Sequence, residues 1–173
     1  MRHGTFETVD GRPAVRFERD LRHPVQTVWA AVTEPGELAH WFPCAVAFDA
    51  LAPGAGITFT FPPDAGGEVM RGQVLQVQAP RRLTFTWGGA TIDIALEPIA
   101  DGTRLTFVNV LEAADEAARA AAGWDVCLEQ LERALGGEDA AAPGGTPTPQ
   151  WRERYAAYEA RGFPAGAPVP GGA

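Results

Sequence analysis

The chain has 173 residues, enough for one domain with an appendage. Its 22 acidic residues outnumber 14 basic ones and give a net charge of −8, which argues against nucleic acid and anionic membranes as partners. All 14 basic residues are arginine, so Schiff-base lysine chemistry and a lysine-dependent phosphate loop are excluded.

The sequence gives no indication of export, of a membrane span or of a metal site. Cys44 and Cys127 lie far apart, and the N-terminal MRHGTFETVDGR lacks the apolar core of a signal peptide, so we expect a cytoplasmic location. No apolar run approaches the roughly 20 residues that span a bilayer. The three histidines form no close-spaced ligand pair, and the sequence predicts neither a metal site nor a cofactor.

A strand and two short helices come first in the chain. Residues 15–21 alternate in character, which is typical of a strand with one buried face. One side of the strand has Val15, Phe17, Arg19 and Leu21, and the other has Arg16, Glu18 and Asp20. A helix then begins at Pro24, where a proline costs no hydrogen bond, and Pro35 opens a second short helix that ends at Pro43. The apolar residues of these two helices are Val25, Val28, Trp29, Val32, Leu38, Trp41 and Phe42.

Six further strands are predicted at residues 44–49, 57–61, 68–78, 82–87, 90–98 and 103–110. Their connections are rich in Gly, Pro and Asp, and Gly88-Gly89 and Asp101-Gly102 favour hairpins between antiparallel neighbours. A long amphipathic helix follows over 115–135, with Gly136 placed to cap it. Burying its apolar face against the sheet gives an α+β fold, and a curved sheet gripping a helix is expected to leave a cavity.

The C-terminal part has a different composition. Residues 136–149 are predicted to be a flexible linker, 150–162 a short helix and 163–173 a disordered or draped tail, after a main domain over 12–135. The helix carries an aromatic stripe of Trp151, Tyr155 and Tyr158, which must dock on apolar surface because so short a helix is unstable alone. We expect docking on its own domain, at the back of the sheet or the short-helix end, with a homodimer as the alternative.

Four segments resemble a known superfamily. HPVQTVWAAVTEPGELAHWFP resembles the opening signature of the START-like, or SRPBCC, superfamily, in its bacterial branch related to the activator of heat-shock-protein-90 ATPase. RGQVLQVQAPRRLTFTW, IDIALEPIADGTRLTFVN and AAGWDVCLEQLERAL match later pieces in the same order, so the resemblance covers about 12–135. It implies a helix-grip fold, with a curved antiparallel sheet wrapped around a long C-terminal helix, two short helices after the first strand and a central hydrophobic cavity.

Two kinds of residue are candidates for ligand binding in that cavity. Asp93 and Asn109 are polar residues in apolar strands and could anchor a ligand, although Asp93 lies between two isoleucines and is expected to face solvent. An inward-facing Asp93 would have Arg71 as its candidate partner. The large rings that could line the cavity, each more often plain core when taken singly, are Trp41, Phe59, Phe61, Trp87, Phe107 and Trp124.

The sequence therefore favours a binding protein for a small apolar or aromatic ligand, since no catalytic constellation emerges. One alternative, implied by the name of the family branch, is a co-chaperone-like or stress-related interaction module. The other is an enzyme of the cyclase or aromatase kind that uses Asp93, Arg71 or His40. Cys44 and Cys127 have no adjacent histidine, so a nucleophilic thiol is not expected.

Overall fold

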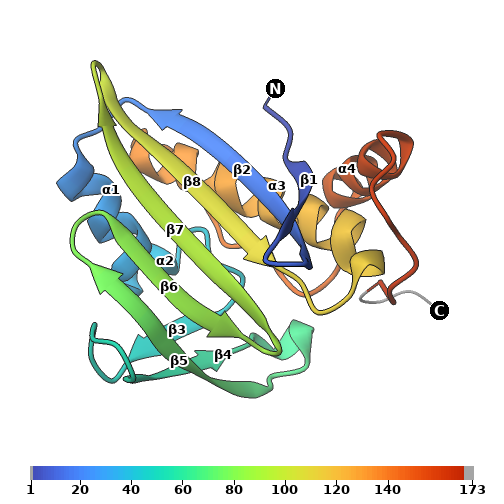
Figure 1. Cartoon of the computed structure of the whole chain (residues 1–173), viewed down its shortest axis with the longest axis horizontal. Coiled ribbons are helices and arrows are strands. Elements are labelled where there is room, and N and C mark those ends of the chain that lie inside the picture. Colours follow the sequence, from blue (N-terminus) through green and yellow to red (C-terminus); the bar gives the residue numbers. More distant parts are fainter. Residues whose placement is uncertain (1, 170–173) are drawn as a thin grey trace.

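Figure 1 shows the computed structural model, which describes residues 2–169. A single curved sheet contains eight strands in the order β1-β2-β8-β7-β6-β5-β4-β3, and every neighbouring pair is antiparallel. The strands are β1 (Thr5–Val9), β2 (Arg12–Leu21), β3 (Ala45–Phe48), β4 (Gly56–Thr60), β5 (Val69–Gln78), β6 (Arg82–Trp87), β7 (Ala90–Ile99) and β8 (Gly102–Val110).

Two short helices lie at one end of the sheet, the long helix lies along its inner face, and the last helix packs against the long one (Figure 1). They are α1 (Val25–Thr33), α2 (Pro35–Leu38), α3 (Ala117–Leu135) and α4 (Pro149–Ala160), with single 3₁₀ turns η1 (Pro63–Ala65) and η2 (Ala114–Glu116). A curved antiparallel sheet around the long helix α3, with two short helices after β2, confirms the predicted α+β helix-grip fold. None of the helices among residues 2–169 is both long enough and apolar enough to cross a bilayer.

The core lies between the sheet and α3. Inward-facing strand residues such as Phe17, Ile92 and Phe107 are at most 1% exposed, and they meet Ala121 and Leu128 of α3, which are fully buried. Alternation along the strands and the helical period of α3 produce these two apolar faces, so burial of both drives their packing.

Strand β1 was not predicted, and the sheet has eight strands where the sequence indicated seven. Asp10 and Gly11 take φ values of 49° and 78° and join β1 to β2 in a tight hairpin, for which Asp-Gly is a favoured pair. The strand itself is an edge strand whose residues are exposed or half-buried, so it shows little hydrophobic alternation. The hairpin turn was the only strong signal for it.

The end of α3 and the docking of α4 also differ from expectation. Gly136 keeps a helical φ of −75°, and it is Gly137, with φ 73°, that takes the left-handed conformation ending the helix. Helix α4 packs against α3, not on the back of the sheet or at the short-helix end (Figure 1). The reason is a buried polar partner: the Tyr158 hydroxyl donates to Asp125 on α3 at 2.9 Å.

Residues 163–169 continue along the N-terminal end of α3. The Ala118 amide donates to the Pro164 carbonyl at 3.0 Å, which satisfies one of the donors that a helix N-terminus leaves free. The Arg119 guanidinium donates to the Pro168 carbonyl at 2.8 Å. This stretch is draped over the helix, while the rest of the expected tail, 170–173, lies outside the described residues.

Candidate functional site

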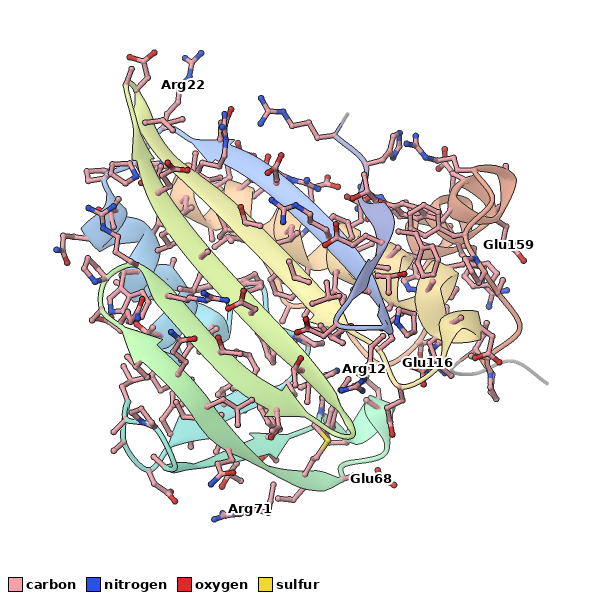
Figure 2. All side chains as sticks on the ribbon, in the orientation of Figure 1. Arg12, Arg22, Glu68, Arg71, Glu116 and Glu159 are labelled. Carbon is pink, nitrogen blue, oxygen red and sulfur yellow. The ribbon has the colours of Figure 1, made fainter. Side chains whose placement is uncertain are left out.

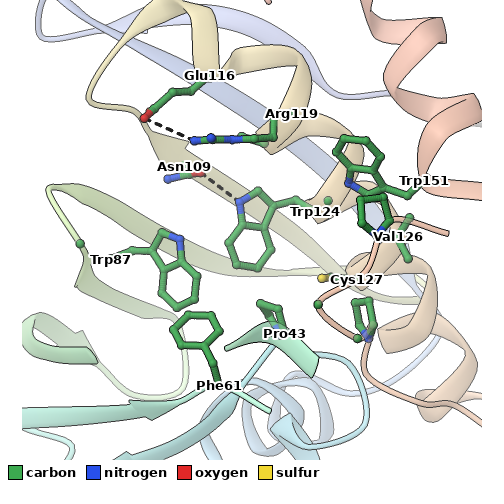
Figure 3. A pocket seen from close by; sticks show the side chains of 18 of the residues that line it. Pro43, Phe61, Trp87, Asn109, Glu116, Arg119, Trp124, Val126, Cys127 and Trp151 are labelled. Atoms are coloured by element: carbon green, nitrogen blue, oxygen red, sulfur yellow. Dashed lines mark hydrogen bonds and ion pairs between the residues drawn. The ribbon is translucent and has the colours of Figure 1, made fainter. Parts of the chain in front are cut away.

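A cavity of about 650 Å³ opens between one end of the sheet and the first half of α3 (Figure 3). One wall comes from the ends of β6 and β8, the starts of β5 and β7, and Phe61 just after β4, and α3 supplies the other. Residues 143–148, named the strap from here on, and Trp151 of α4 complete it. The apolar lining residues include Pro43, Phe61, Met70, Trp87, Leu111, Ala120, Trp124, Cys127 and Trp151.

Four of the predicted site residues line this cavity: Phe61, Trp87, Asn109 and Trp124. Trp87 and Trp124 are neighbours in the wall, with ring centroids 5.7 Å apart. Each comes from the inward face of its own element, and the elements converge because the sheet curves around α3.

Three other predicted rings lie in the core behind the wall. Trp41, Phe59 and Phe107 are 0% exposed, and none of them is a lining residue. Phe59 packs edge-to-face on Trp87 at 5.0 Å between centroids, and Phe107 packs on Trp124 at 4.8 Å. Trp41 instead packs edge-to-face on Phe42 at 5.5 Å between centroids.

Asp93 lies on the face of the sheet away from α3, so it cannot anchor a ligand in this cavity. Its carboxylate accepts hydrogen bonds from Arg82 at 2.9 and 3.0 Å and from the Thr84 hydroxyl at 2.7 Å. Arg71, at the lower rim in Figure 2, is not its partner and instead donates to Thr58. Cross-strand pairing on β6 and β7 satisfies Asp93 and explains why it points outward.

Asn109 is a polar residue inside the apolar wall, and it is only 2% exposed. Its Oδ1 accepts from the Trp124 indole nitrogen at 3.0 Å, and its Nδ2 donates to the Thr91 carbonyl at 3.1 Å. Because both ends of the amide are engaged within the protein, Asn109 orients Trp124 rather than offering a free group to a ligand.

Sequence reasoning missed the strap as part of the site. Its Gly145 amide donates to the Asp64 carboxylate at 3.1 Å, and an added Cβ on Gly145 would lie 2.3 Å from the Ala65 Cα. Only glycine permits so close an approach to the η1 backbone. Thr148 ends the strap and caps α4, its hydroxyl accepting from the Trp151 amide at 3.1 Å.

The charged residues of the cavity stand at its rim. Arg119 pairs with Glu116 at 3.5 Å, and the carboxylates of Asp64 and Glu112 lie nearby in the lining. Among residues 2–169 no group of three or more His, Cys, Asp or Glu side chains could hold a metal ion. The rim is therefore acidic overall, with its one arginine already paired.

The lining shows no nucleophile paired with a base. Cys127 is the only thiol in it, and burial raises the pKa of that thiol, which disfavours the reactive thiolate. Burial likewise raises the pKa of Cys44 to about 12. His40 is exposed on the surface after α2, and neither it nor Arg71 nor Asp93 lines the cavity, so the residues proposed for a cyclase do not meet a ligand there.

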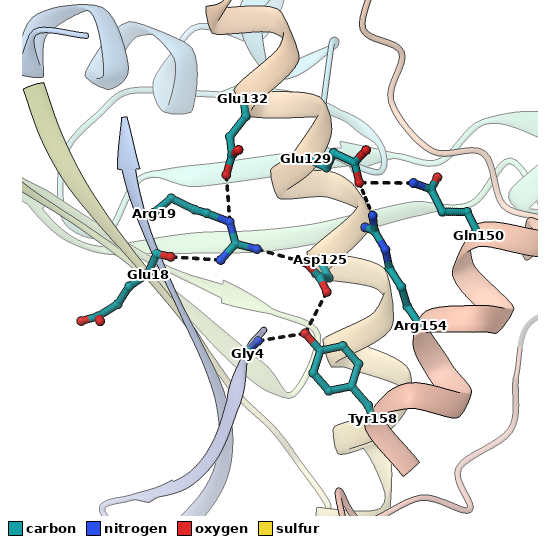
Figure 4. Close-up of polar contacts among 9 residues, drawn as sticks. All are labelled: Gly4, Glu18, Arg19, Asp125, Glu129, Glu132, Gln150, Arg154 and Tyr158. Atoms are coloured by element: carbon teal, nitrogen blue, oxygen red, sulfur yellow. Dashed lines mark hydrogen bonds and ion pairs between the residues drawn. The ribbon is translucent and has the colours of Figure 1, made fainter. Parts of the chain in front are cut away.

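A buried polar cluster on the other side of α3 holds α4 in place (Figure 4). Arg19 of β2 pairs with Asp125 at 3.0 Å and with Glu132 at 2.9 Å, and Arg154 of α4 pairs with Glu129. Burial raises the pKa of Tyr158, so its hydroxyl stays protonated and donates to Asp125. The cluster fixes α4 on α3 and thereby fixes Trp151 at the cavity.

Solved structures with similar folds come from several bacteria. CalU16 from Micromonospora echinospora has a TM-score of 0.69 at 23% identity, over 92% of this chain and 96% of its own. A conserved protein of unknown function from Enterococcus faecalis has a TM-score of 0.71 at 24% identity, over 91% of each chain.

A third structure, of DynU16, is described as a protein of the dynemicin biosynthetic locus. It has a TM-score of 0.63 at 28% identity, over 74% of this chain and 49% of its own. No curated protein matches the sequence significantly.

The family model described as Activator of Hsp90 ATPase homolog 1-like protein matches residues 22–136, which is more than half of the chain. Its span runs from just before α1 to the end of α3 and includes six of the eight strands, β3 to β8. The chain therefore belongs to the Activator of Hsp90 ATPase homolog 1-like family, in the START-like superfamily.

Proposed function

We propose that this protein binds a small, largely apolar molecule in the cavity between the sheet, α3 and the strap. The observation that carries the proposal is the lining: about 650 Å³ walled by Phe61, Trp87, Trp124 and Trp151, with the charged side chains at the rim and Asn109 paired to Trp124. Cavities of this size and composition are typical of small-molecule sites. The predicted site residues Trp41, Phe59 and Phe107 would act from behind the wall.

A binding role is favoured over catalysis because the lining has no nucleophile and base in contact. The biosynthetic-locus description of DynU16 supports a metabolite as the ligand rather than a second protein chain. A chaperone partner, a homodimer and a cytoplasmic location stay predictions from the sequence and the family name.

Saturation with the neutral fluorescent dye N-phenyl-1-naphthylamine tests the proposal. We expect one dye per chain with the wild type, and loss of binding in Ala120→Phe, because the new ring would fill space at the cavity wall. Ala156→Phe, at an exposed position of α4, is the matched control and should bind the dye normally.

Both variants should first be shown to melt cooperatively, so that lost dye binding reports the cavity and not unfolding. Dye binding that is absent in the wild type, or that persists unchanged in Ala120→Phe, would contradict the proposal. Native mass spectrometry of the purified protein would add the mass of any ligand carried through purification.

A further inference from the structure

The indole nitrogens of the cavity differ in what they bond. Trp124 donates to Asn109, and Trp41, in the core, donates to the Ala31 carbonyl at 2.9 Å. Trp87 and Trp151 also have indole N–H groups, but within residues 2–169 neither donates to a protein acceptor. Neither nitrogen is fully buried, since the single buried side-chain atom left without a partner in that range belongs to Arg154.

The Trp151 indole nitrogen lies close to Gly123 of α3. A Cβ on Gly123 would lie 3.8 Å from the Trp151 Nε1, and both residues line the cavity. Since Gly123 has no side chain, no side-chain atom from this position lies between α3 and the Trp151 indole nitrogen at the cavity wall. Figure 3 shows Trp87, Trp124 and Trp151 following one another along the site.

The charged residues at the rim of the cavity restrict the charge of the ligand. Asp64, Glu112 and Glu116 contribute carboxylates, whereas the one guanidinium of the lining, Arg119, is engaged by Glu116 and by the Pro168 carbonyl. An anionic ligand would therefore meet like charge without a free cation to offset its lost hydration.

We propose that the ligand is an aromatic molecule without negative charge that carries a hydrogen-bond acceptor, such as a ring ketone, and that the indole N–H groups of Trp87 and Trp151 receive it. This inference rests on the proposed binding function and adds the chemical class. The flat indoles stack on the ring system, and the N–H donors select for the acceptor, because a ligand without one leaves them unpaired in an apolar site.

Trp151 lies beyond the family domain, which ends at residue 136. The strap and α4 would then do more than close the cavity, because they bring in one of its two donors. Relatives that lack this segment would lack that donor as well.

Fluorene and 9-fluorenone form a matched probe pair, since they share one ring skeleton and differ by a carbonyl oxygen. We expect wild-type protein to bind fluorenone about three- to tenfold more tightly than fluorene, the range for one or two net hydrogen bonds, measured by equilibrium dialysis. The preference should disappear in the double variant Trp87→Phe/Trp151→Phe, which keeps two rings and loses both donors. Trp29→Phe, outside the cavity, is the control and should keep it.

Gly123→Ala provides an independent variant that leaves both tryptophans in place. Its methyl group would make van der Waals contact with the Trp151 Nε1 and crowd an acceptor there, so we expect fluorenone binding to weaken while fluorene binding stays unchanged. Fluorene-9-carboxylate should bind more weakly than fluorene, because it is an anion.

The outcomes separate the two proposals. Fluorene and fluorenone binding equally, a preference that survives in the double variant, or tighter binding of the carboxylate would each overturn this inference while leaving an apolar binding site intact. If neither neutral probe binds, the proposed function fails and the inference fails with it.

Discussion

Tyr158 joins three parts of the chain through one hydroxyl group. The hydroxyl donates to Asp125 on α3 at 2.9 Å and accepts from the Gly4 amide at 2.8 Å, just before β1. Its ring is 1% exposed and packs on Phe163 at 4.7 Å between centroids. A phenylalanine would keep the ring and leave two buried polar groups short of a partner.

We therefore expect Tyr158→Phe to lower the free energy of unfolding by about 1–3 kcal/mol in urea titrations at neutral pH, the cost of leaving buried groups unpaired. Tyr155→Phe is the matched control, because that half-buried ring stacks on Trp151 and its hydroxyl makes no hydrogen bond within residues 2–169. Equal stability losses in the two variants would contradict the role of the hydroxyl.

The loss of stability in Tyr158→Phe should depend on pH. Burial raises the pKa of Tyr158 in the folded protein above the value of 10.0 of a free tyrosine, so the unfolded chain loses this proton first as pH rises. The contribution of the hydroxyl is complete below pH 10 and declines above it. The gap in stability between wild type and Tyr158→Phe should therefore narrow in alkaline solution.

At the scale of elements, the strap is held to the body of the protein by few contacts. The hydrogen bond from the Gly145 amide to Asp64 is exposed, and so, just before the strap, is the bond from the Ala141 amide to Gln130 at 3.2 Å. Exposed bonds of this kind contribute little free energy, so the strap should open far more readily than the sheet. Opening it would expose the cavity to solvent.

Asp64→Ala should accordingly leave the melting temperature nearly unchanged and accelerate amide hydrogen exchange in peptides covering 143–148. If a dye occupies the cavity, its dissociation should also become faster in stopped-flow measurements. Asp139→Ala, an exposed change in the same connection, is the control. Exchange rates that are the same in Asp64→Ala and wild type would show that this bond does not hold the strap.

For the whole molecule, α4 and residues 163–169 pack on α3, and the strap closes the cavity between α3 and the sheet. Truncation after Gly137 would remove Trp151, Tyr158 and Phe163 together and leave the Asp125 carboxylate without its tyrosine. We expect a lower melting temperature, more aggregation from the uncovered apolar surface and loss of dye binding. Truncation after Val169 is the control and should behave as wild type.

The truncated protein tests the docking of α4 directly. If it proves as stable and as soluble as the full chain, α4 contributes nothing to the fold and this prediction is wrong. If it is stable but no longer binds dye, the C-terminal segment serves the cavity alone.

The fold was predictable because alternation and helical period appear clearly in β2, β4–β8 and α3. The same parity separates the two polar candidates: Asn109 has the phase of buried Phe107 and points inward, whereas Asp93 lies between buried Ile92 and Ile94 and points outward. An odd or even position along a strand predicts which face of the sheet a side chain lies on. It does not predict how far along the strand the core ends and the cavity begins. It could not tell the lining ring Phe61 from the core ring Phe59.

The strap could not be recognised from sequence. Its glycines and prolines have the composition of a linker, and only contact with Asp64 and Ala65, some eighty positions earlier, makes them a wall. Trp151 was expected to dock its ring on apolar surface, yet nothing local indicated that this surface borders a cavity. Long-range contacts decide both, and hydrophobic periodicity does not contain them.

The bond between Gly4 and Tyr158 spans 154 positions, and it has a consequence for the order of events on the ribosome. Once α3 has emerged, the sheet can close on its inner face, but Asp125 still awaits Tyr158. At about 5–20 residues per second, translation needs roughly one to five seconds more to supply α4. During that interval the nascent chain holds a nearly finished domain with one face of α3 uncovered, and Gly4, just before β1, gains its partner only when α4 arrives.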